Sequence, residues 1–222
     1  MTLRGPHLKQ LHRLRWGLQL LTPLVFIAAT ASAQDVQSWN EIDLTATIHR
    51  VDLLVPLLAR TDPAVANPQL AATGITADLH LPAHLTLTPG YLFADLAQPP
   101  YRVHVPLIAI TESIRLGPFT IADRNRFEKL FSYPTQPFRY RNRLLLDYAL
   151  RKAHLFLDDE LFVNLKARNF NQNRLQAGAG VRVNRHLNLD LYYLQKNPPT
   201  GPAIHVVGST LRIALARPGH SP

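Results

Sequence analysis

The sequence contains no cysteine, and its first residue is its only methionine. A chain without cysteine forms no disulfide, carries no lipid on a terminal thiol and offers no thiolate to a zinc ion or a substrate. A disulfide-stabilised scaffold, a lipoprotein, and thiol or cysteine-zinc chemistry are therefore excluded. The apolar surfaces must be built from Leu, Ile, Val, Ala and aromatic side chains.

Long apolar runs are also lacking after residue 33, where no stretch approaches the roughly 20 residues that a transmembrane helix needs. The chain has 24 Lys and Arg residues against 15 Asp and Glu residues, a formal net charge of +9. Such a charge is common among nucleic-acid-binding proteins, but the sequence has no run of Lys and Arg and no motif of stacking aromatic residues. Together with the export signal described next, this predicts that nucleic acid is not a partner.

The first 33 residues have the three parts of a secretory signal peptide. Residues 1–15 carry four basic side chains and no acidic one, and residues 16–29 are mostly apolar. The triplet Ala31-Ser32-Ala33 then supplies the small residues at alternate positions that signal peptidases recognise. An uncleaved membrane anchor is the alternative, but the apolar stretch is short for a spanning helix and is interrupted by polar residues and a proline.

We therefore expect cleavage after Ala33, so that residues 1–33 are a signal peptide and the mature protein begins at Gln34. Residues 34–222 keep 20 basic and 15 acidic residues, a net charge of +5. Their 189 residues are the length of one domain.

Polar and apolar residues alternate over short segments of the mature chain. The clearest segment is RYRNRLLLDY at residues 139–148, in which one parity carries the charges and the other begins and ends in tyrosine, at Tyr140 and Tyr148. Because successive side chains of a strand point to opposite faces, this segment has one charged face and one mostly apolar face. Eight residues span roughly 26 Å along a strand, or about 20 Å of depth in a tilted strand, which is close to the apolar band of a membrane barrel.

The same alternation recurs at residues 41–48, 75–81, 155–165, 173–183, 187–193 and 207–215. Short links are expected near residues 49–50, 82–84, 117–118, 151–152 and 184–186, and longer links at residues 60–71, 96–100, 132–137, 167–171 and 197–202. Short periplasmic turns and longer outer loops produce this rhythm in outer-membrane barrels. The sequence thus predicts an all-β fold, a single antiparallel transmembrane β-barrel over residues 34–222, in the bacterial outer membrane with the lipid bilayer as its partner.

Eleven strands can be counted in this pattern, whereas closed single-chain barrels of bacteria normally have an even number. Omitting residues 51–59 would leave ten strands, but this segment is too apolar for an exposed outer loop. We therefore expect about twelve strands, with ten as the alternative.

Charged residues gather on the strand faces opposite the apolar ones and are candidates for lining the lumen, the interior of the barrel. They are Arg124, Arg126, Glu128, Arg139, Arg141, Arg143, Asp147, Asp158, Glu160, Arg174, Arg182, Asp190 and Arg212. A charge is tolerated in the lumen and costly on the lipid side. Two interpretations remain open: the charges pair with one another and fill the lumen, or they form a basic constriction that favours anions.

Several segments resemble a known family: QSWNEIDLTA, DRNRFEKLF, FRYRNRLLLDYAL, HLFLDDELFVNL and NQNRLQAGAGVRVNRHLNLDLYY. Together they are similar to the bacterial outer-membrane-type barrel family catalogued as domain of unknown function 2490, over about residues 37–215. The resemblance implies a barrel and an outer-membrane location, and it supplies no activity and no catalytic residues.

No catalytic or metal site is evident in the sequence. His205 and Ser209 share a parity, but four residues of strand separate them by about 13 Å, too far for a base to reach its nucleophile. We expect no enzyme, no cofactor and no metal. Three alternatives to a channel stay open: a soluble periplasmic lipid-binding barrel with an apolar interior, an outer-membrane lipid hydrolase whose Ser and His come from different strands, and a structural barrel with a plugged lumen.

Overall fold

The computed structural model describes residues 36–62, 65–97, 100–133 and 137–215. The expected signal peptide, residues 1–33, and its cleavage site lie outside these residues. No helix in the described part of the chain is long and apolar enough to cross a membrane, a finding that does not bear on crossing by strands.

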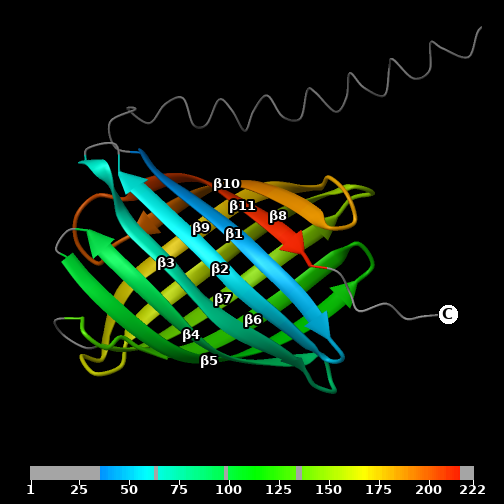
Figure 1. The fold of residues 1–222 in the computed structure, drawn as a ribbon, viewed down its shortest axis with the longest axis horizontal. Helices are drawn as coiled ribbons and strands as arrows, with labels where there is room; N and C mark the ends of the chain where they lie inside the picture. The colour runs from blue at the N-terminus through cyan, green and yellow to red at the C-terminus, as the bar shows by residue number, and fades with distance from the viewer. Residues whose placement is uncertain (1–35, 63–64, 98–99, 134–136, 216–222) are drawn as a thin grey trace, which may run out of the picture.

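The described residues form one closed barrel of eleven strands (Figure 1). In chain order the strands are β1 (Val36–Ile48), β2 (Val51–Asp62), β3 (Val65–His80), β4 (Leu85–Ala97), β5 (Pro100–Leu116), β6 (Phe119–Lys129), β7 (Phe138–Ala149), β8 (Ala153–Asn164), β9 (Asn169–Arg182), β10 (Leu187–Asn197) and β11 (Ile204–Ala214). Each strand pairs antiparallel with the next, and the strands run obliquely around the long axis of the barrel. The predicted all-β barrel is therefore confirmed.

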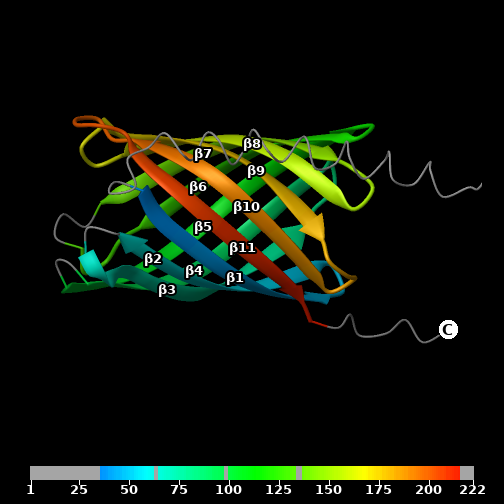
Figure 2. The same cartoon turned by 90° about the horizontal axis from the view of Figure 1, so that it is seen from above.

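The predicted number of twelve strands is wrong, and so is the alternative of ten. The barrel closes where β1 and β11 lie side by side and pair in parallel, from Val36 opposite His205 to Thr45 opposite Ala214 (Figure 2). An odd number of strands is compatible with closure because the first and last strands of an antiparallel series then point the same way, and two strands that point the same way can form a parallel ladder. The apolar residues 51–59 belong to β2.

The links between strands differ at the two ends of the barrel. At the end that we call the turn end, strands connect through residues 49–50, 81–84, 117–118, 150–152 and 183–186, as predicted for the short links. At the opposite loop end, links occur as predicted near residues 132–137, 167–171 and 197–202. The loops expected at residues 60–71 and 96–100 are wrong, because most of these residues extend β2, β3, β4 and β5.

The outer face of the barrel is apolar all the way round. Every strand exposes at least one large apolar side chain, for example Ile42, Leu57, Ile75, Tyr91, Ile108, Ile121, Leu144, Leu157, Leu175, Leu191 and Val207 in strand order. Leu144 and Leu191 are 53% and 57% exposed. Monomeric soluble proteins rarely expose apolar surface that is both this large and continuous.

Outward-facing aromatic rings gather toward both ends of this apolar surface. Toward the loop end, Phe127 packs on Tyr140 with ring centroids 5.2 Å apart, and Tyr193 stacks on His205 at 5.9 Å. At the turn end, Phe119 and Tyr148 pack at 4.8 Å. Apolar residues between two aromatic groups form the surface pattern that membrane barrels show.

Inward-facing glycines give room to large side chains inside the barrel. A Cβ at Gly208 would overlap the ring of Tyr192, and a Cβ at Gly180 would overlap His154 and Asp190. In β9, the alternating glycines Gly178 and Gly180 therefore leave space for the side chains of Phe156, His154 and Asp190.

Candidate functional site

The lumen contains a cavity of about 970 Å³ that is lined by residues of β1 to β10. Its lining extends from Asn164 and Lys196 near the loop end to His80 and Thr86 near the turn end. The inner faces of β2 to β5 and those of the remaining strands differ in chemistry, so we describe them as two walls.

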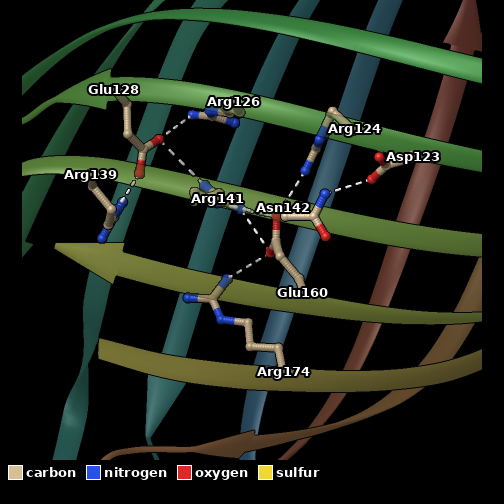
Figure 3. A network of polar contacts seen from close by, with 9 residues as sticks. All are labelled: Asp123, Arg124, Arg126, Glu128, Arg139, Arg141, Asn142, Glu160 and Arg174. Carbon is tan, nitrogen blue, oxygen red and sulfur yellow. Dashed lines mark hydrogen bonds and ion pairs between the residues drawn. The ribbon is translucent and has the colours of Figure 1, made fainter. Parts of the chain in front are cut away.

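The charged wall is centred on β6, β7 and β8, whose inward-facing residues form one network of ion pairs (Figure 3). Glu128 on β6 is fully buried and accepts from three guanidinium groups. Its Oε2 lies 2.8 Å from Nη2 of Arg126 and 3.5 Å from Nη1 of Arg141, and its Oε1 accepts from Nε of Arg139. A buried carboxylate with three charged donors has its hydrogen-bonding capacity well satisfied.

Glu160 on β8 forms the second centre of the network. Its Oε1 lies 2.9 Å from Nη2 of Arg124 and 2.8 Å from Nη2 of Arg141, and Nη1 of Arg174 lies 3.8 Å from its Oε2. Arg141 contacts both Glu128 and Glu160 and so joins the two centres.

Strand register explains why these side chains meet. Between β6 and β7 the Cα partners are Arg124 with Arg143, Arg126 with Arg141, and Glu128 with Arg139. Two of these pairs place like charges opposite each other, which is unfavourable in isolation. Glu160, which enters from β8 as the Cα partner of Arg143, supplies negative charge beside them.

A column of cations and aromatic rings continues this wall toward β1 and β2. Phe162 on β8 is 0% exposed, and the guanidinium carbons of Arg141 and Arg174 lie 4.5 and 4.4 Å from its ring centroid. The guanidinium carbon of Arg174 also lies 5.0 Å from the ring centroid of Trp39, and that of Arg60 lies 3.8 Å from the same centroid. Cations over aromatic faces gain electrostatic stabilisation without a counter-ion.

The cavity lining carries an excess of positive charge. Among the described residues, eight Lys or Arg side chains and five Asp or Glu side chains line it. Arg60, Arg143 and Lys196 form no ion pair with a carboxylate of the described residues. The Nε atoms of Arg60 and Arg143 are buried and have no hydrogen-bond partner in this part of the chain.

The apolar wall covers β2 to β5. Its inward-facing residues are Leu54, Leu58, Leu70, Ala72, Leu92, Ala94, Leu96, Val103, Val105, Leu107 and Ala109. Part of this set packs into a cluster around Val103, Val105 and Leu130. Threonines at positions 76, 88 and 111 follow toward the turn end.

The structure places nine of the thirteen sequence candidates on the cavity lining: Arg124, Arg126, Glu128, Arg139, Arg141, Arg143, Asp158, Glu160 and Arg174. Asp147, Asp190 and Arg212 do not line it and belong to a second cluster closer to the turn end. There His154 bridges Asp147 at 2.8 Å and Asp190 at 3.1 Å, while Arg212 pairs with Asp190 and lies 3.8 Å from Asp43. Arg182 is exposed at the end of β9, outside both groups.

Sequence reasoning missed Arg60, Lys196, Trp39 and the entire apolar wall. The sequence pattern predicts a loop at Arg60, although Leu54, Leu58 and Arg60 share one parity, as residues on one face of a continuous strand do. The apolar wall gave no alternation signal, because β2 carries apolar residues on both faces. For a strand with two apolar faces, the face that points into the lumen can be identified only when the neighbouring strands are known.

A few polar side chains lie on the outer face and satisfy one another. The amide of Asn142 donates to Oδ1 of Asp123 at 2.5 Å (Figure 3). Asn125 donates to Oδ2 of the same carboxylate at 3.1 Å. Asn173 likewise donates to Asp159. These pairs hold polar groups of neighbouring strands against the wall of the barrel.

His205 and Ser209 are not partners. His205 shares a hydrogen bond of 2.5 Å with the hydroxyl of Tyr193, and the hydroxyl of Ser209 donates to Oδ1 of Asn40 at 2.8 Å. Among the described residues, no group of three or more His, Asp or Glu side chains is arranged to hold a metal ion.

A closed all-β barrel with salt-bridged charges in its interior is the class of protein that the fold and the site define. The chain belongs to the family described as protein of unknown function (DUF2490), whose model matches residues 36–202. The resemblance seen in the sequence is thereby confirmed. No curated protein is significantly similar to the chain.

Proposed function

We propose that the protein is an outer-membrane β-barrel whose cationic lumen admits small anions. The observation that carries the proposal is the inverted distribution of residues, with apolar side chains exposed around the whole circumference and ion-paired charges inside. This is the distribution that a barrel in lipid requires and a barrel in water avoids. The signal peptide expected at residues 1–33 would deliver the chain across the inner membrane, and the turn end would face the periplasm.

The preference for anions follows from the charge balance of the lumen. Glu128 and Glu160 are each shared among three arginines, so the network neutralises its carboxylates and leaves positive charge over. Among the described residues, Arg60, Arg143 and Lys196 face the cavity and form no direct ion pair with a carboxylate, although Glu41 acts electrostatically on Arg60 and Asp158 on Arg143. Rings or clusters of Arg and Lys favour anions in pores.

Observations on the outer face argue against the alternatives. A soluble lipid-binding barrel would carry its charges outside and an apolar interior, which is opposite to the arrangement of the ion pairs here. A lipid hydrolase would need a serine hydrogen-bonded to a histidine of another strand. Among the described residues, the serine hydroxyls of Ser209 and Ser38 are hydrogen-bonded to Asn40 and not to a histidine. We therefore propose a non-enzymatic role.

The test is the ion selectivity of the refolded protein in planar bilayers under a salt gradient. The proposal predicts conductance with a reversal potential of the sign that chloride preference gives. Replacing Arg60 and Lys196 together by Gln should lower this preference, while Arg102→Gln, on the outer face of β5, serves as the matched control. A lumen without conductance, as in a plugged structural barrel, or a cation preference would overturn the proposal.

A further inference from the structure

The cavity is chemically two-sided, and this asymmetry restricts what it can hold. The boundary on one side lies between β5 and β6, where Leu107 is the Cα partner of Glu128 and Ala109 of Arg126. On the other side it lies at β2, whose inner face carries the apolar Leu54 and Leu58 and, at its loop end, Arg60. A small inorganic anion would use only the charged wall and leave the apolar wall facing water.

Positive charges converge at the loop end of the apolar wall. Four cations from β2, β7, β9 and β10 meet there: Arg60, Arg139, Arg174 and Lys196. Arg60 and Arg174 lie 3.8 and 5.0 Å from the ring of Trp39, and Arg139 and Arg174 lie 5.4 and 4.4 Å from that of Phe162. Lys196 is the Cα partner of Arg174. Arg139 pairs with Glu128, and Arg174 pairs with Glu160. Among the described residues, Arg60 and Lys196 form no direct ion pair, and the nearby carboxylate of Glu41 acts on Arg60 only electrostatically. Like charges that converge without enough counter-ions are stabilised by a bound anion.

The apolar wall begins beside this cationic group and continues toward the turn end. On β5 the inward-facing residues from Tyr101 to Ala109 span roughly 26 Å along the strand at about 3.3 Å per residue. The neighbouring inner faces are apolar over shorter lengths, from Leu70 to Ala72 on β3 and from Leu92 to Leu96 on β4, and become polar farther toward the turn end. The whole cavity, at about 970 Å³, is as large as the sites that bind drug-sized molecules.

We propose that the lumen binds a single-chain amphiphile with an anionic headgroup, the headgroup lying among Arg60, Arg174 and Lys196 and the alkyl chain on the apolar wall of β2 to β5. This inference rests on the proposed function, because it requires the lumen to be open to solutes. It goes further in that both walls contribute: charge-assisted hydrogen bonds orient the headgroup, and burial of methylene groups supplies affinity. A phosphate or a carboxylate headgroup satisfies the same chemistry.

Native mass spectrometry of the full chain, released from a nonionic detergent, tests the proposal with three probes: dodecyl phosphate, dodecanol and inorganic phosphate. We expect dodecyl phosphate to form a one-to-one complex, and the two probes that satisfy only one wall to bind at least about tenfold more weakly. Equal binding of dodecyl phosphate and dodecanol would overturn the role of the cations, and equal binding of dodecyl phosphate and inorganic phosphate would overturn that of the apolar wall.

Variants assign the binding to the two walls. Arg60→Gln should weaken the binding of dodecyl phosphate by about tenfold and leave the binding of dodecanol unchanged, because it removes charge-assisted hydrogen bonds and keeps the apolar wall. Ala94→Phe should weaken the binding of both amphiphiles, because the larger side chain fills the space beside the apolar wall. Arg102→Gln, which removes an arginine from the outer face of the neighbouring strand β5, is the control for charge and should change neither.

Native β-sheet circular dichroism identifies variants that still fold, and Arg60→Lys provides a milder second substitution that should recover part of the affinity. If Arg60→Gln and Arg102→Gln weaken binding equally, the amphiphile lies outside the lumen and the proposal fails. The reversal potential in bilayers is a separate measurement. Amphiphile binding without anion preference would support this inference and contradict the proposed channel. Anion preference without amphiphile binding would support the channel and contradict this inference.

Discussion

Glu128 is the residue on which the charged wall depends most. Its side chain is fully buried; it compensates the guanidinium groups of Arg126 and Arg139 and shares that of Arg141 with Glu160. Removing one partner of a buried ion pair is costly, because the remaining charges stay in a poorly solvated place.

We expect Glu128→Gln to lower the free energy of unfolding by about 3–5 kcal/mol, measured by urea titration of the folded barrel in detergent. The double variant Glu128→Gln with Arg139→Gln should recover part of this loss, because it removes a charge that has lost its partner. Glu112→Gln, on the outer face of β5, is the control and should change stability little. A loss as small for Glu128→Gln as for Glu112→Gln would contradict the network.

At the residue scale, the sequence allowed the face of a charged residue to be predicted but not its partners. Arg139, Arg141 and Arg143 share a parity on which Leu145 is the only apolar residue between positions 139 and 147, and strand geometry alone assigns them to one face. Arg124 and Glu160, however, are 36 residues apart in the chain. Their pairing depends on the register of three strands, which alternation does not determine.

At the element scale, the closing pair of β1 and β11 is the feature that distinguishes eleven strands from ten or twelve. Asn40 and Ser209 are Cα partners there, and their side chains are hydrogen-bonded to each other. The cysteine-free sequence makes a cross-link between them a clean test.

We expect Asn40→Cys with Ser209→Cys to form a disulfide within one chain on mild oxidation, seen as a shift on non-reducing gels, because Cα atoms of paired strands lie within disulfide reach. Asn40→Cys with Val207→Cys is the matched control, since Val207 pairs with Ser38, two residues along the ladder. Efficient cross-linking of the control, or none of the test pair, would mean that the barrel closes in another way.

Alternation predicted the strands unevenly along the chain. From β7 to β11 one face is charged or polar, so the period of two is visible and the strands are found close to their actual bounds. From β2 to β5 the inner face is the apolar wall, and two apolar faces hide the period. The even strand number came from a general regularity of bacterial barrels, and nothing in the residues of β1 or β11 indicated their parallel pairing.

At the scale of the whole molecule, the proposed function requires that the outer face of the barrel contacts lipid and that the inner face contacts water. The apolar outer face and the charged inner face could have been predicted as separate surfaces, because each follows from parity. The division of the lumen into a charged and an apolar wall could not, because it requires knowing that β5 lies against β6 and β2 against β1. The proposed anion preference and the amphiphile site both depend on this division.

Site-directed spin labelling of the protein in lipid bilayers tests the central claim most directly. Single cysteines at positions 144, 145 and 146 of β7 would carry the label one at a time, since Leu144 and Leu146 face outward and Leu145 lines the cavity. The account predicts that labels at 144 and 146 respond to lipid-soluble oxygen, and that the label at 145 responds to a water-soluble nickel chelate, because successive side chains of a strand point to opposite faces. Equal response of all three labels to the nickel chelate would contradict it, because the outer face of the barrel would then lie in water.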